Sequence, residues 1–150
     1  MAEEAIATGI LHVSWPDVVT RAASQGMEEA LATESLAVLE QRHYAEREPL
    51  CAGGAILMVE LSPRGFRKVV DTIVSGAETA RQHIIASLVN APPDSNTVID
   101  DLATLTGAPR LFVFEFLREL QAQGHLTLIR PVSGNSVVAG ISPALKRLLE

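Results

Sequence analysis

The sequence predicts an α+β fold in which three helices followed by a β-hairpin occur twice, as two small domains at 1–76 and 77–150. The first observation is the pattern of the second half, where three segments with helical spacing of apolar residues precede two short alternating segments. The second is a repeat, because Ser62-Pro63 lies 80 positions before Ser142-Pro143. A period of this length fits two copies of a small domain and not a solenoid. The alternative interpretation is one such domain preceded by a helical extension.

The composition indicates a globular protein, since 47% of the 150 residues are apolar and 20% are charged. The formal net charge is −6, and a protein that neutralises phosphates usually has a basic surface. Cys51, the single cysteine, excludes an intramolecular disulfide and fits a reducing compartment. The acidic start Met1–Glu4 differs from a signal peptide, and no apolar run approaches the roughly 20 residues that span a bilayer. We therefore expect a cytoplasmic protein without membrane contact.

The first half opens with a helix-start signal. Ser14 can cap a helix, Pro16 fits its first turn, and Asp17 follows the serine by three residues. Gly26 then ends this helix. Two more helices are predicted, a short one over 27–31 and a longer one over 34–47.

Two glycines between apolar runs predict a hairpin near the end of the first half. Gly53-Gly54 would be its turn, between strands at 49–52 and 55–61. Gly54 also lies 80 positions before Gly134, the centre of the turn predicted in the second half. Ser62-Pro63 then opens a helix. Its apolar stripe consists of Phe66, Val69, Val70, Ile73 and Val74.

The second half begins with a helix over 78–89, which the two prolines of 90–96 end. A short strand is predicted at 97–98 and a second helix at 99–106. Asp100 and Asp101 stand in the first turn of that helix, where acidic side chains complement the positive helix terminus.

The third helix of this half runs between two glycines. Gly107 closes the preceding helix, Pro109 starts the third, and Gly124 ends it. A hairpin and a last helix complete the pattern. They are predicted as strands at 125–130 and 137–141, a turn at 133–135 and a helix at 144–149.

The second half resembles the winged helix-turn-helix family. The residues that carry this resemblance are Asp101-Leu102-Ala103, Gly107, Arg110, Val113, Leu117, Leu120 and Gly124, followed by a hairpin. The phrase Leu61-Ser62-Pro63-Arg64-Gly65 resembles the exit from the wing in many bacterial winged-helix regulators. Leu36 and Leu39 lie 81 positions before Leu117 and Leu120, so a degenerate second copy over 1–76 is the expected arrangement. The resemblance implies tandem winged-helix domains of three helices and a hairpin each.

The residues point away from catalysis, and no cofactor is expected. None of the four histidines has a histidine or cysteine at i+3 or i+4, and no Cys-x-x-Cys occurs, so a metal site is not expected. No nucleophile has a recognisable base beside it. The chain is therefore interpreted as a non-enzyme.

DNA is the partner that the resemblance implies, bound by a dimer in the manner of a transcription regulator. In helix-turn-helix proteins the third helix lies in the major groove, and its outward side chains meet bases and phosphates. The candidate DNA-binding residues of this chain are Arg110, Arg118, Arg130, Lys146 and Arg147. Each of them could equally be an ordinary solubilising charge.

The same helix also favours the alternative, a protein-interaction or assembly module that binds no DNA. With Val113 facing the core, Leu111, Glu115 and Arg118 point outward. The candidate interface residues are Leu111, Phe112, Phe114 and Glu115. Neither half is basic, because the net charge is −5 over 1–76 and −1 over 77–150. Some family members use this surface for assembly, among them tandem winged-helix subunits of chromosome-condensation and membrane-sorting complexes. A homodimer, or a protein partner on the third helix, is the expectation.

Overall fold

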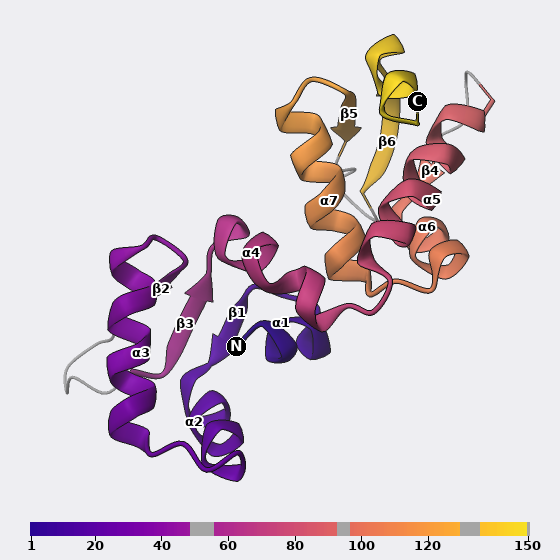
Figure 1. Ribbon diagram of the computed structural model, residues 1–150. Helices are drawn as coiled ribbons and strands as arrows, with labels where there is room; N and C mark the ends of the chain where they lie inside the picture. Colours follow the sequence, from indigo (N-terminus) through magenta and orange to yellow (C-terminus); the bar gives the residue numbers. More distant parts are fainter. Residues whose placement is uncertain (49–55, 93–96, 130–135, 150) are drawn as a thin grey trace. The chain divides into compact units, whose positions relative to one another are not determined.

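The computed structural model describes residues 1–48, 56–92, 97–129 and 136–149 (Figure 1). The chain divides into two compact units, Met1–Ile73 and Val74–Glu150. Within the described residues the fold is α+β, with eight helices and two antiparallel sheets of three strands. Cys51, Arg130 and the predicted turns at 53–54 and 133–135 lie outside the described residues.

The first unit places a small antiparallel sheet among four helices. In chain order its elements are α1 (Ala2–Thr8), β1 (His12–Ser14), α2 (Trp15–Ser24), α3 (Glu29–Gln41), β2 (Ala45–Arg47), β3 (Met58–Leu61) and α4 (Pro63–Ile73). The strand order is β1-β3-β2, so β3 is central. Its core is formed by Ala5, Val13, Leu36, Val59, Leu61, Phe66 and Val70.

Local signals position α2 and α4 as predicted. The Ser14 side chain accepts a hydrogen bond from the Asp17 N–H at 3.4 Å and caps α2. At α4 the Ser62 hydroxyl accepts from the Gly65 N–H at 3.0 Å and donates to the His43 carbonyl at 2.8 Å. Ser62 therefore caps α4 and ties its start to the end of α3.

The predicted helices at 27–31 and 34–47 are wrong, because one helix, α3, replaces both and ends at Gln41. Polar residues do not interrupt it: the Thr33 hydroxyl donates to the Glu29 carbonyl at 3.0 Å. The chain after the helix forms β2, in which Ala45 pairs with Leu61 of β3. The predicted strand at 49–52 lies outside the described residues. Helix α1 and strand β1 were not predicted at all.

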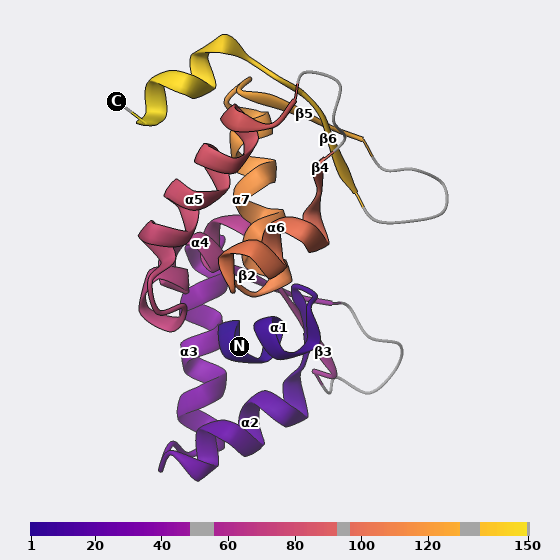
Figure 2. The ribbon, with the colours of Figure 1, turned by 90° about the vertical axis from the view of Figure 1, so that its right-hand side faces the viewer.

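The second unit has the same order of elements. They are α5 (Ala77–Asn90), β4 (Thr97–Val98), α6 (Ile99–Thr106), α7 (Arg110–Ala122), β5 (Leu126–Ile129), β6 (Val137–Ile141) and a 3₁₀ helix, η1 (Pro143–Leu149). The strand order is β4-β6-β5, and Figure 2 shows the helices α5, α6 and α7 on one side of this sheet. Gly107 and Gly124 follow α6 and α7 with φ of 65° and 75°, as predicted for residues that end a helix.

Backbone hydrogen bonds align the third helices of the two units at an offset of 81 residues. Helices α3 and α7 both have 13 residues. After them the Tyr44 N–H donates to the Leu39 carbonyl at 2.9 Å, and the His125 N–H donates to the Leu120 carbonyl at 2.8 Å. The carbonyls of Tyr44 and His125 then accept from Ser62 (3.0 Å) and Ser142 (2.7 Å).

The turn that follows each third helix shows where the copies differ. Gly124 adopts the left-handed conformation in the second unit, and His43 adopts it in the first with φ of 57°. A side chain in this region costs roughly 1–2 kcal/mol, so the first unit carries strain that the second avoids.

Candidate functional site

The first candidate surface is the outward face of α7, the helix to which sequence reasoning assigned both DNA and protein contacts. Leu111, Phe112 and Glu115 are buried, with exposed fractions of 5%, 2% and 3%. The expectation that Leu111 and Glu115 point outward is therefore wrong. Phe114 is half-buried, and Arg118 is exposed.

Buried side chains of α7 cover more of the helix circumference than a single apolar stripe would. The prediction assumed that only the side of the helix that contains Val113 faces the core. In the structure both α6 and β5 pack on the helix. Arg81 of α5 also lies over the rings of Phe112 and Phe116, 5.5 and 5.9 Å from their centroids. Leu111, Phe112 and Glu115 are consequently not available as interface residues in this conformation.

The arginines proposed to contact DNA are paired with acidic side chains. Arg118 Nη1 lies 3.1 Å from the buried Glu115 Oε1, and its guanidinium lies 5.8 Å from the centre of the Phe114 ring. Arg110 Nε lies 2.6 Å from Asp100 Oδ1. The structure thus brings Arg118, Glu115 and Phe114 together, while Arg110 contacts the preceding helix α6. Neither arginine is free to meet phosphate without giving up a carboxylate.

Lys146 and Arg147 remain from the predicted DNA-binding set, and both are exposed on η1. Neither is paired with a carboxylate in the part of the chain that the structure describes. Arg130, the last member of the set, lies outside the described residues.

The second candidate surface is the outward face of α3, the counterpart of α7 in the first unit. Leu31 and Val38 stand seven residues apart on one side of the helix, with exposed fractions of 52% and 47%. Met27, just before the helix, is also exposed. We call these three residues the α3 stripe. Sequence reasoning missed it because it divided α3 into two helices.

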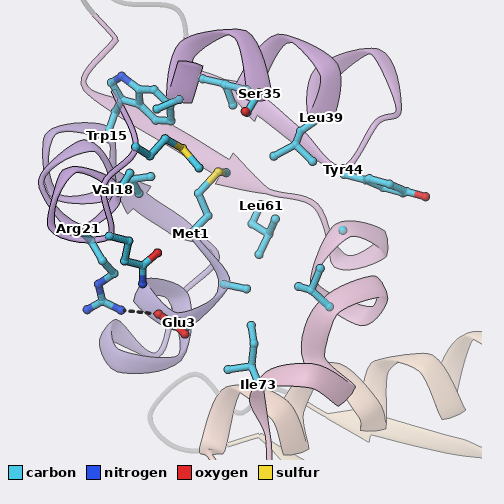
Figure 3. Close-up of a pocket in the computed structure, with 18 residues that line it drawn as sticks. Met1, Glu3, Trp15, Val18, Arg21, Ser35, Leu39, Tyr44, Leu61 and Ile73 are labelled. Atoms are coloured by element: carbon cyan, nitrogen blue, oxygen red, sulfur yellow. Dashed lines mark hydrogen bonds and ion pairs between the residues drawn. The ribbon is translucent and has the colours of Figure 1, made fainter. Parts of the chain in front are cut away.

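The third candidate is an apolar pocket of about 370 Å³ between α1, α2, α3 and α4, within the first unit (Figure 3). Its labelled apolar walls are Met1, Trp15, Val18, Leu39, Leu61 and Ile73. Met27 and Val69 also line it and are themselves exposed, so the pocket opens to solvent. An ion pair between Arg21 Nη1 and Glu3 Oε2, at 3.2 Å, stands at its edge.

One residue of the pocket wall, Ser35, corresponds in sequence to an aromatic residue of the second unit. At the offset of 81, Leu31 corresponds to Phe112 and Ser35 to Phe116. In α7 these rings stack with centroids 6.4 Å apart, beneath the guanidinium of Arg81. In α3 the shorter side chain of Ser35 lines the pocket, whereas Leu31 is exposed and does not line it.

The ionisable side chains in the pocket lining include Glu3, Arg21 and Tyr44. No histidine or cysteine is among the described residues that line the pocket. His12 Nε2 lies 3.0 Å from Glu48 Oε1 and 3.7 Å from Glu60 Oε2, on the exposed surface of the sheet. Among the described residues no three metal-ligating side chains come together.

Comparison with known proteins assigns none of these surfaces. No protein-family model, curated protein or solved structure matches the chain. Within the described ranges, no helix has the length and apolar character needed to cross a membrane. A function for this chain is therefore inferred from its own surfaces and pocket.

Proposed function

We propose that the chain is a non-catalytic assembly module made of two tandem winged-helix domains, and that it pairs with a second copy of itself through α3. The observation that carries this proposal is the α3 stripe, formed by Met27, Leu31 and Val38. Large apolar side chains grouped on one face of a surface helix are typical of contact surfaces.

The order of elements supports the winged-helix part of the proposal. Each unit runs helix, strand, helix, helix, two strands and a final helix. In each, the first of the three strands pairs with the third. This order, together with the offset of 81 between the third helices, agrees with the sequence resemblance and with a duplication of one domain.

The two ends of the α3 stripe carry opposite charges. Glu28 stands at the N-terminal end and Arg42 at the C-terminal end, while the exposed Glu34 and Ser35 lie between Leu31 and Val38. An antiparallel pairing centred between Leu31 and Val38 places each leucine on the valine of the partner. The same arrangement brings Arg42 of one copy near Glu28 of the other. A surface that is complementary to itself in this way fits a closed dimer.

The substitution Val38→Glu tests the pairing. We expect the purified chain to have a dimeric mass by light scattering at high micromolar concentration. The loss of two buried valines would cost about 3 kcal/mol per dimer, so the dissociation constant should rise about 100-fold.

Ala30→Glu is the matched control, because it adds the same charge to an exposed position of α3 about 100° away from Leu31. This variant should keep the mass of the unmodified chain. A monomeric unmodified chain would contradict the pairing, and so would a folded Val38→Glu variant that dimerises as before.

DNA binding is a second candidate function, favoured by Lys146 and Arg147 of η1, which are exposed and have no carboxylate partner among the described residues. The test is the affinity for mixed genomic DNA over a salt series. If both residues contact phosphates, replacing both with alanine should lower the slope of log affinity against log salt by about two. An affinity that does not change with salt would remove this candidate. Either function belongs to a cytoplasmic protein in our proposal, in keeping with a single cysteine.

A further inference from the structure

The pocket of the first unit has the size and the walls of a small-molecule site. Its volume of about 370 Å³ falls in the range of ligand pockets, roughly 300–1,000 Å³. Trp15, Leu36 and Leu61 are buried side chains that form part of its wall. Ser35 and Tyr44 add hydroxyl groups to the lining.

The two units differ at one position of the pocket wall. Leu36 and its counterpart Leu117 are both buried, and Leu39 and Leu120 also stand at equivalent positions. Ser35, which lines the pocket and is exposed, stands where the second unit has the larger Phe116. Apolar walls that are open to solvent leave hydrophobic surface in contact with water. An occupant that covers these walls would remove that surface from water, which is favourable.

The charges around the pocket define the kind of occupant. The Arg21 guanidinium and the Glu3 carboxylate are ion-paired with each other, so together they add no net charge to the opening. A charged molecule would lose hydration in the apolar interior without a matching counter-ion. We propose that this pocket binds a small uncharged molecule, aromatic or branched aliphatic, with at most one polar group. The site goes beyond the proposed assembly function, although Met27 belongs both to the α3 stripe and to the pocket lining.

The full chain can be titrated with N-phenyl-1-naphthylamine, an uncharged apolar fluorescent probe. Trp15 is the single tryptophan of the sequence and lines the pocket, so it can transfer excitation energy to a bound probe. We expect probe emission to rise to saturation at one probe per chain, and Trp15 emission to fall in parallel.

Ser35→Phe tests the location of the probe, because it introduces the residue that the second unit has at this position. The ring should weaken probe binding at least about tenfold. Ser35→Ala, which leaves the space open, is the matched control and should bind within about twofold of the unmodified chain. If Ser35→Phe fails to fold, Ala32→Leu places added volume in the same pocket from a buried position.

Several outcomes would overturn the proposal. They are the absence of saturable binding to the unmodified chain, binding without loss of Trp15 emission, and unchanged binding by a folded Ser35→Phe or Ala32→Leu variant. Val38→Glu separates this site from the pairing of α3, because Val38 does not line the pocket among the described residues. That variant should lose dimerisation and keep probe binding.

Discussion

Replacing Phe112 with alanine should destabilise the second unit by about 4 kcal/mol, the usual range for a buried phenylalanine being about 3–5 kcal/mol. Phe112 is 2% exposed, stacks on Phe116 and lies beneath Arg81. Its removal leaves a cavity and takes away the contact surface of both neighbours. Urea unfolding followed by circular dichroism would measure the change.

Leu105→Ala is the control for this experiment, because Leu105 lies in α6 of the same unit and is largely exposed. It should change the unfolding free energy by less than about 0.5 kcal/mol. Equal effects of the two substitutions would mean that Phe112 does not belong to the core, and would reopen α7 as an interface helix.

Replacing Gly65 with alanine should destabilise the first unit by about 3 kcal/mol, at the upper end of the range for overpacking. A Cβ at this position would collide with the carbonyl oxygen of Tyr44, with the carbonyl carbon and Cα of the same residue 2.8 and 2.9 Å away. That oxygen accepts the hydrogen bond of the Ser62 N–H. The whole junction between α3 and α4 would therefore have to shift.

The fluorescence of Trp15 reports on this unit, because Trp15 is its buried tryptophan. Gly140→Ala is the control for an added methyl group, since a Cβ at Gly140 meets no described heavy atom within 4 Å; its unfolding is followed by circular dichroism because Gly140 lies in the second unit. Its effect should stay within about 0.5 kcal/mol. A Gly65→Ala variant as stable as this control would show that α4 can move away from Tyr44 at little cost.

Much of the fold follows from local interactions, such as helix capping, that can be recognised in the sequence. Ser14, Gly107 and Gly124 act within a turn or two of the chain, and each was predicted in the role that the structure shows. The errors arose where tertiary pairing decides the outcome. Residues 45–47 form a strand because β3 is available to pair with them, and helical spacing of apolar residues does not reveal that partner.

The candidate site was harder to predict, for a related reason. Helical projection could not show that Arg110 would bind Asp100, which is ten residues away on another helix. The pocket did leave a signal, because extending the 81-residue offset from Leu36 and Leu39 along the helix pairs Ser35 with Phe116. Which side chains then line the open space depends on α1 and α2, whose placement the repeat does not specify.

The two sheets also bear on how the protein avoids aggregation. Each has its longest strand in the middle, and the outer strands β1, β2, β4 and β5 have three, three, two and four residues as described. Short outer strands offer an approaching chain few unpaired amides and carbonyls to extend into an intermolecular sheet. Contacts between copies must then use side chains on helices, which select a partner by shape, whereas backbone pairing accepts almost any extended segment.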